Sequence, residues 1–282
     1  MSDTRQIRLK EWPPLKVRNL LPTPEFLDRS DETLGSGPFV LRTDENGFIV
    51  TGNNKPATDT PIALIGGSFV ESSFCDERAR FIDLAENDLH GYRLLNGGYS
   101  GSTTLQLFNS MVSKIFPAVG VGGTLVFFVG QSDADVFNRQ GSYWTNEARW
   151  SPVTPGFEPH ENLPGGQDGL RQLVSIVIDT ARTLGINLIL ASSPFRNGDF
   201  SHDAVLRKIF RRNRDVFNQR QKVREQIREI TLEVAREKNA DVIDFQGITG
   251  GEASWFYDDL HLNSHGHREF SRVLVKELRK LI

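Results

Sequence analysis

Short, mainly apolar segments alternate with longer amphipathic segments along most of the chain. The apolar segments are typical of buried strands, and the longer ones carry apolar residues at helical spacing. Strands and helices that alternate in this way predict a three-layer α/β/α fold with a mainly parallel sheet. The predicted strands cover 61–65, 92–96, 123–129, 187–191 and 241–245, and the predicted helices cover 77–90, 103–116, 167–184, 203–238 and 264–281.

The N-terminal part of the chain lacks this alternation. Residues 1–35 are rich in proline and charge, which predicts an extended arm that lies over the core. Segments 39–42 and 47–50 flank an Asn46-Gly47 pair, a strong signal for a hairpin turn. We therefore divide the chain into an N-terminal arm with a β-hairpin, residues 1–58, and an α/β domain, residues 59–282.

A long segment rich in aromatic residues interrupts the α/β domain at about residues 134–165. Long loops within compact domains are either functional, such as a lid or a substrate wall, or pack on the core. Both interpretations stay open at this point. In the functional one, Tyr143, Trp144 and Trp150 bind the substrate.

Composition excludes several classes of protein. The chain of 282 residues has a formal net charge of −3, which argues against a general nucleic-acid-binding surface. A single cysteine, Cys75, excludes an internal disulfide. No apolar stretch is long enough for a membrane span, and the polar N-terminus does not resemble a signal peptide, so we expect a cytoplasmic protein. Without a phosphate-binding motif, no cofactor is expected.

Two segments carry the residue types of a serine nucleophile and its base. Ser68 follows a predicted strand and two glycines, and a tight strand-to-helix turn would expose its hydroxyl. His261 follows Asp258 by three residues, just before the last predicted helix. A serine needs a general base, and the base needs a carboxylate that fixes its tautomer. Both segments follow predicted strands, where parallel sheets place reactive residues.

Four segments occur in an order that resembles the signature blocks of the SGNH (GDSL-type) hydrolase family. They are IGGSF (65–69), NGG (96–98), VGQSD (129–133) and DDLH (258–261), and the resemblance spans about residues 40–282. LRTDENGF, before the first block, is similar to a lead-in found in some bacterial members.

The resemblance implies a flavodoxin-like sheet and a role for each matching residue. It makes Ser68 the nucleophile and His261 the general base and then acid, oriented by Asp258. The backbone N–H groups of Ser68 and Gly98 would be two donors of the oxyanion hole. Such preorganised donors usually contribute the largest single part of the catalysis.

Two positions depart from the family pattern. Gly67 replaces an aspartate that is not itself catalytic, and Ser132 replaces the asparagine whose amide is the third oxyanion donor. A serine hydroxyl can donate one hydrogen bond, but it is shorter than an asparagine amide. Three outcomes are open: Ser132 donates, Gln131 reaches in with its own amide, or the hole has two donors.

Two other polar clusters have simpler interpretations. His261, His265 and His267 lie near Asp258, but their spacing spans the start of the last predicted helix. We therefore interpret His265 and His267 as surface residues and expect no metal. The basic stretch 207–228 favours a solvated helix face, with a docking surface for an acidic partner or anionic saccharide as the alternative.

The combined prediction is a serine esterase or deacetylase. Its substrates would be small acyl esters, for example O-acetyl groups on carbohydrate, and the reaction would pass through an acyl-enzyme on Ser68. An O-acyltransferase is one alternative. The other is a non-catalytic SGNH-like binding module, because Ser132 replaces the oxyanion asparagine.

Overall fold

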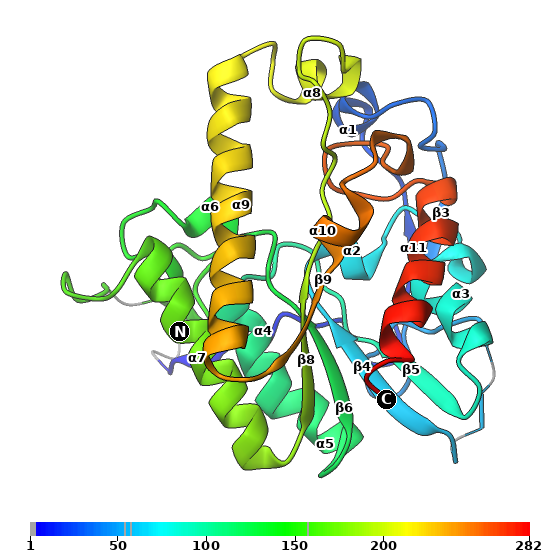
Figure 1. The fold of residues 1–282 in the computed structure, drawn as a ribbon, viewed down its shortest axis with the longest axis vertical. Helices are drawn as coiled ribbons and strands as arrows, with labels where there is room; N and C mark the ends of the chain where they lie inside the picture. Colours follow the sequence, from blue (N-terminus) through cyan, green and yellow to red (C-terminus); the bar gives the residue numbers. More distant parts are fainter. Residues whose placement is uncertain (1–3, 54, 57, 157) are drawn as a thin grey trace.

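A five-stranded parallel sheet forms the centre of the computed structural model, which describes residues 4–53, 55–56, 58–156 and 158–282 (Figure 1). The strand order is β5-β4-β6-β8-β9, the flavodoxin-like order in which the second strand lies outside the first. All four neighbouring pairs are parallel, as the sequence predicts. The strands are β4 (Thr60–Ile65), β5 (Tyr92–Asn96), β6 (Thr124–Phe128), β8 (Asn187–Ser192) and β9 (Asp241–Asp244).

Alternate residues of each strand enter two separate cores, one on each face of the sheet. In β4, Ala63 and Ile65 belong to one core, while Ile62 and Leu64 belong to the other. The first core is covered by α4 (Thr104–Ser110), α7 (Gly166–Leu184) and α9 (Arg214–Glu237). The second is covered by α3 (Phe81–Asp88) and α11 (Ser264–Leu278). This arrangement confirms the predicted three-layer α/β/α fold.

The single helix predicted for residues 203–238 is wrong, because the segment forms two helices. Asp203 caps α8 (Ala204–Ile209), and Asn213 caps α9; each side chain accepts hydrogen bonds from backbone N–H groups of the first turn. Arg211 and Arg212, between the helices, have positive φ angles, so the helix cannot continue through them.

Three of the remaining helical segments run on from one another, and the others are short. The helix that begins with α4 continues through a π-helical turn, η2 (Met111–Ile115), into α5 (Phe116–Val119). In the ranges that the structure describes, no helix combines the length and the apolar character needed to cross a membrane. The short helices are α2 (Ser68–Glu71), η1 (Glu77–Ala79), α6 (Asp133–Val136), η3 (Ser142–Trp144), α10 (Phe245–Thr249) and η4 (Ala253–Trp255).

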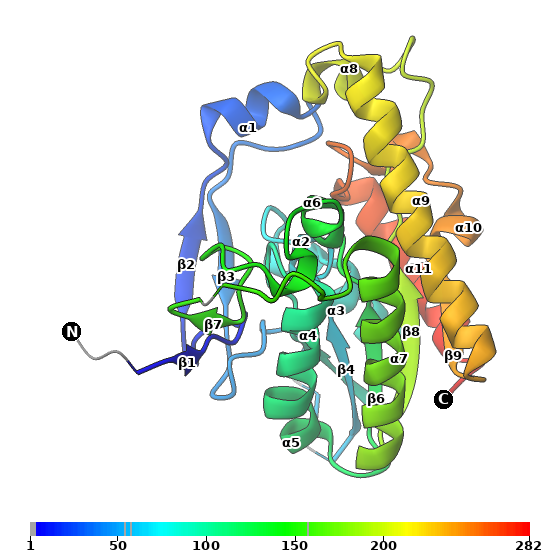
Figure 2. The same ribbon diagram turned by 90° about the vertical axis from the view of Figure 1, so that its left-hand side faces the viewer.

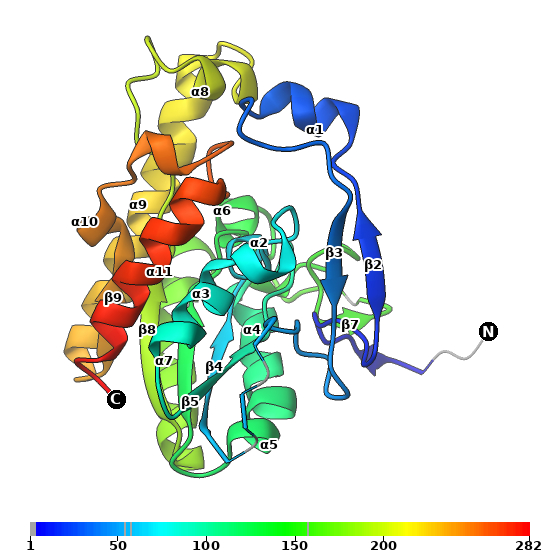
Figure 3. The ribbon, with the colours of Figure 1, turned by 90° about the vertical axis from the view of Figure 1, so that its right-hand side faces the viewer.

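The N-terminal arm follows one side of the domain (Figures 2 and 3). Its first strand, β1 (Gln6–Ile7), pairs with β7 (Val153–Thr154) of the 134–165 segment. Strand β2 (Val17–Leu20) pairs with β3 (Phe39–Arg42), and α1 (Pro24–Arg29) lies between them. Helix α1 contacts α8, and the two stand together at one end of the molecule.

The predicted hairpin is only partly formed. The turn at Asn46-Gly47 is present, since the Gly47 N–H donates to the Asp44 carbonyl at 3.1 Å. Beyond it, the Phe48 carbonyl accepts from the Asp44 N–H, the Val50 N–H donates to the Arg42 carbonyl, and Ile49 makes a single bridge to Thr43. The Ile49 N–H, however, donates to the Asn96 carbonyl of the central sheet. The ladder partner of β3 is β2, so the two-stranded unit of the arm joins different segments from those predicted.

The aromatic residues proposed to bind substrate lie in the hydrophobic core. Tyr143 and Trp150 are only 1% and 3% exposed, and they belong to the core beneath α7. Trp144 is partly buried and packs against the same core. Of the two interpretations of this segment, the structure favours packing, because burying these rings removes a large apolar area from water.

Candidate active site

Ser68 directly follows a tight turn between β4 and α2. The strand ends at Ile65, Gly66 and Gly67 follow, and Ser68 is the first residue of the helix. A Cβ atom on Gly66 would lie 2.5 Å from Cγ2 of Val70, so only glycine fits there. The turn leaves the Ser68 side chain half-buried at the carboxyl end of the strand.

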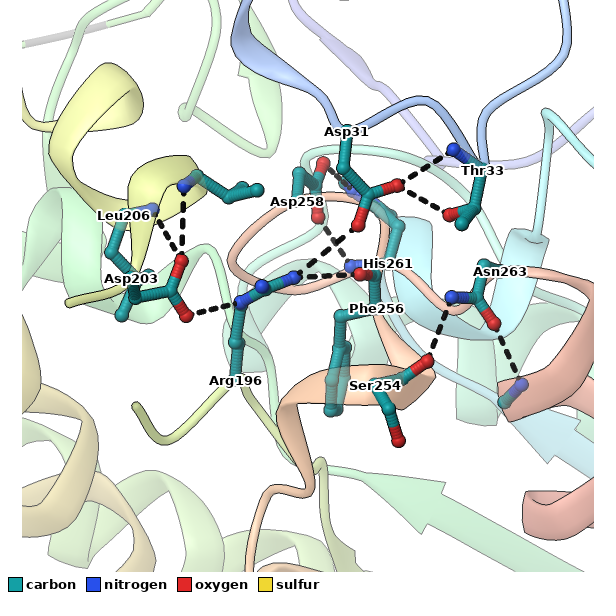
Figure 4. A network of polar contacts seen from close by, with 12 residues as sticks. Asp31, Thr33, Arg196, Asp203, Leu206, Ser254, Phe256, Asp258, His261 and Asn263 are labelled. Carbon is teal, nitrogen blue, oxygen red and sulfur yellow. Dashed lines mark hydrogen bonds and ion pairs between the residues drawn. The ribbon is translucent and has the colours of Figure 1, made fainter. Parts of the chain in front are cut away.

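The three residues predicted as a triad lie within hydrogen-bond distance of one another. His261 Nε2 is 2.7 Å from Ser68 Oγ, although the residues are 193 positions apart. On the other side of the ring, His261 Nδ1 is 2.6 Å from Asp258 Oδ2 (Figure 4). With the Nδ1 proton on the aspartate side, Nε2 is left as an acceptor for the serine proton.

The charge around the imidazole favours its protonated form. Burial, the largest single effect, acts to lower the pKa of His261, and the charge and hydrogen bond of Asp258 act to raise it. The carboxylates of Asp259 and Glu71 act in the same direction. The pKa of His261 is therefore raised above its ordinary value, a direction that would suit a general base.

Two arginines hold the loop that carries Asp258 and His261, and Figure 4 shows one of them, Arg196. Arg196 donates to the Phe256 carbonyl at 2.8 Å and binds Asp203, the cap of α8, at 2.7 Å. Arg224 binds Asp259 at 2.6 Å from helix α9. Both arginine side chains are largely buried, so the loop is tied to the helices behind it.

A pocket of about 160 Å³ opens beside the serine. One part of its wall is aromatic and comes from Phe26, Phe74 and Tyr257, while Ser68, Ser73, Ser100 and His261 form the polar part. The ring of Tyr257 stacks on His261 with centroids 5.7 Å apart.

The aromatic wall was not predicted from the sequence. Phe26 lies in α1, within the segment interpreted only as an arm. A local signal for that helix exists, because Thr23 precedes Pro24 and its side chain accepts from the Phe26 N–H at 3.2 Å. The signal marks the helix but gives no indication that Phe26 reaches the pocket.

Gly98 does not offer a free donor in this structure. Its N–H donates to Oδ1 of Asn96 at 3.0 Å. A Cβ atom on Gly98 would lie 2.3 Å from the backbone nitrogen of Glu71, so the glycine lets its loop pack against α2. The N–H expected from the resemblance as the second oxyanion donor therefore already has a partner, Asn96, and its role in an oxyanion hole stays a prediction.

The third signature segment, residues 129–133, is held in place by hydrogen bonds to the Asp133 carboxylate. Asp133 is fully buried and accepts hydrogen bonds from the backbone N–H of Thr104 at 2.8 Å and from its hydroxyl at 2.5 Å. Burial raises the pKa of Asp133 to about 7. The amide of Gln131 donates to the Ser193 carbonyl at 2.9 Å, so it is already engaged. Ser132, half-buried, caps α6 without a side-chain hydrogen bond.

Of the two histidines that follow His261, His267 has a structural role. His265 is exposed, but His267 is buried and its Nδ1 accepts from the Phe81 N–H at 3.2 Å. The expectation of a surface histidine is therefore wrong for His267, which faces α3. Across the described ranges, no cluster of three or more His, Cys, Asp or Glu side chains is suited to a metal ion.

The basic stretch is divided between internal ion pairs and solvent. Besides the pair of Arg224 with Asp259, Arg220 binds Asp135 at 2.7 Å. Arg228 binds Asp244 at 2.5 Å. The exposed cations are Arg207, Lys208, Arg211, Arg212, Arg214 and Lys222. An acidic partner on this surface stays a prediction.

The raised pKa of His261 leads to the first prediction. In an NMR titration, His261 should titrate above the ordinary histidine value, and Asp258→Asn should lower its pKa because the neighbouring negative charge is lost. His267 is an internal reference: burial, together with the charge of Arg80, lowers its pKa to about 3, so its signals should stay constant. An unchanged His261 pKa in Asp258→Asn would contradict the contact.

Comparisons with known proteins give the fold. No protein-family model and no curated protein sequence matches the chain. Solved structures do match, among them the acetyl xylan esterase AlAXEase, with 16% identity over 77% of this chain and 98% of that one, at a TM-score of 0.51. A catalytic mutant of Axe2, an acetylxylan esterase from Geobacillus stearothermophilus, matches with 15% identity. The match covers 79% of this chain and 95% of that one, at a TM-score of 0.52. A lipase/acylhydrolase from Enterococcus faecalis matches with 17% identity over 78% of this chain and 95% of that one, at a TM-score of 0.53. The chain therefore shares its three-layer α/β/α fold with these two esterases and the lipase/acylhydrolase.

Proposed function

We propose that this protein is an SGNH-type carboxylic ester hydrolase that cleaves small acyl esters through an acyl-enzyme on Ser68. The observation that carries the proposal is the contact of His261 with both Ser68 and Asp258, beside a pocket at the carboxyl ends of the strands. A hydroxyl, a neutral imidazole and a carboxylate in this order are the groups that acyl transfer requires.

The reaction follows from the positions of these groups. His261 Nε2 takes the hydroxyl proton while Ser68 Oγ attacks the ester carbonyl carbon. The resulting imidazolium, stabilised by Asp258, then gives its proton to the leaving alcohol as the ester bond breaks. Water, deprotonated by the same Nε2, attacks the acyl-enzyme and releases the acid, and the proton returns to Ser68.

We infer that the oxyanion hole is built from backbone donors near Ser68. The Ser68 N–H comes from the nucleophile turn itself. The second donor belongs to the turn at residues 99–102, where Ser100 lines the pocket. Tyr99 N–H donates to the Gly66 carbonyl and Ser102 N–H to that of Tyr99. The Ser100 N–H donates to the Glu71 carboxylate, whereas the Gly101 N–H has no partner within the described residues, so Gly101 is our preferred donor.

The size of the pocket favours a short acyl group. Its volume of about 160 Å³ is well below the roughly 300–1,000 Å³ of sites for drug-sized ligands. The rings of Phe26, Phe74 and Tyr257 suit a small apolar group such as the acetyl methyl. Two of the similar structures are named acetyl xylan esterases, which supports O-acetyl carbohydrate as the substrate class. Transfer of the acyl group to an alcohol instead of water would use the same residues.

Covalent labelling tests the nucleophile. A fluorophosphonate probe should label Ser68, and short p-nitrophenyl esters should be hydrolysed. Ser68→Ala should abolish labelling and lower kcat by roughly five to six orders of magnitude, because the covalent route is lost. Cys75→Ala, which removes the one thiol, should label at the unmodified rate. A protein that is neither labelled nor active would instead be a binding module.

Chain-length preference tests the pocket. Phe26→Ala should raise kcat/KM for octanoyl relative to acetyl esters by about tenfold or more, since it removes part of the aromatic wall. Phe200→Ala is the matched control, because Phe200 is buried in a separate aromatic cluster with Phe210 and Phe217. A preference that changes equally in both variants would show that Phe26 does not limit the acyl group.

Ser132, at the position where the family pattern has an asparagine, gives a further test. If the hole lacks a third donor, Ser132→Asn should raise kcat by about tenfold or more, because a donor to the oxyanion is restored. Ser132→Ala should lower kcat if the hydroxyl already donates. Unchanged kcat in both variants would mean that position 132 is outside the oxyanion hole.

A further inference from the structure

A buried carboxylate lies one helical turn beyond the nucleophile. Glu71 is only 1% exposed, and it follows Ser68 by three residues on α2. A buried carboxylate costs free energy unless hydrogen bonds replace the lost water. Burial raises the pKa of Glu71, while hydrogen bonds from the Ser73 and Trp12 side chains act to lower it.

The partners of Glu71 come from two distant parts of the chain. Trp12 in the N-terminal arm donates its indole N–H to Oε1 at 2.7 Å. The Ser100 hydroxyl donates to Oε2. The ring of Trp12 also lies 5.6 Å from that of Tyr99. One carboxylate therefore joins the arm, the nucleophile helix and the turn at residues 99–102.

The contacts of Glu71 with Trp12 and Ser100 lie next to the turn that would hold the second oxyanion donor. Ser100 lines the pocket with Ser68, and it precedes Gly101 in the turn. Gly98, before that turn, packs against the backbone of Glu71 itself. Small displacements of a donor cost much of its effect, because stabilisation of the oxyanion requires preorganised geometry.

We propose that Glu71 is a positioning residue which, through Trp12 and Ser100, uses the N-terminal arm to fix the turn at residues 99–102 beside Ser68. This inference rests on the proposed ester hydrolysis. It makes the arm a working part of the site, because the arm supplies both the donor to Glu71 and the Phe26 wall of the pocket.

The neighbouring residue Glu11 offers a matched control. Glu11 binds Lys114 of η2 at 3.0 Å, so it anchors the same stretch of the arm. Lys114 and Glu11 line a different cavity from the one beside Ser68. Glu11→Gln therefore weakens the attachment of the arm without touching the proposed junction.

The experiment compares three single variants and one double variant of the full chain. Trp12→Phe removes the indole N–H together with the fused five-membered ring. Glu71→Gln removes the charge at nearly constant size and leaves one acceptor oxygen for the two donors, Trp12 and Ser100. Each should lower kcat for a short ester by about tenfold with KM changed less than twofold. The reason is that a displaced oxyanion donor stabilises the transition state less, while binding of the ground-state ester is nearly unchanged. The double variant should lose less than the product of the single effects, because both act through one junction. Glu11→Gln should keep its kcat.

The outcomes separate this inference from the function on which it rests. If Trp12→Phe and Glu71→Gln keep the kcat of the unmodified protein, or merely match Glu11→Gln, Glu71 has no positioning role. A rise in KM at constant kcat also overturns it, because that pattern indicates substrate binding. Thermal unfolding of each variant identifies any loss of folded protein. If the unmodified protein shows neither labelling nor turnover, the proposed function fails, and the inference fails with it.

Discussion

The geometry of the site depends on one carboxylate that accepts three hydrogen bonds. Asp258, only 6% exposed, accepts from the backbone N–H groups of Leu260 and His261 and from the His261 ring. The two backbone hydrogen bonds fix the orientation of the Asp258 carboxylate within its own loop. The oxygen that bonds to the His261 ring is therefore held in place. The imidazole is thereby held in the tautomer that presents Nε2 to Ser68.

The glycines of the first three signature segments serve mainly close packing. A Cβ atom on Gly66, Gly98 or Gly130 would lie within 3 Å of neighbouring atoms, from Val70, Glu71 and Ser102 respectively. These loops follow adjacent parallel strands, so they converge at one edge of the sheet and must pass close to each other. In this chain the three glycines therefore meet a steric requirement, which Gly98 fulfils while its N–H bonds to Asn96.

Much of this arrangement could be predicted from local sequence, and the rest depends on distant contacts. Buried strands indicated the sheet, and the order of the signature segments singled out Ser68, Asp258 and His261, which the structure places in hydrogen-bond contact. Phe26 and Trp12 gave no such signal, because their roles depend on contacts with Tyr257 and Glu71 far along the chain. Aromatic composition was misleading for Trp150, since large rings suit a core and a binding site equally well. The break between α8 and α9 depends on caps within a stretch whose apolar spacing continues.

The most direct test of the account is the capture of its covalent intermediate. The protein is mixed with a short acyl ester, quenched in acid during turnover and analysed by mass spectrometry of the intact chain and its peptides. The account predicts a mass increase of one acyl group, located on Ser68, and a faster disappearance of that species when a competing alcohol or amine is added. Release of product without any acylated protein, or an acyl group on another residue, would contradict it.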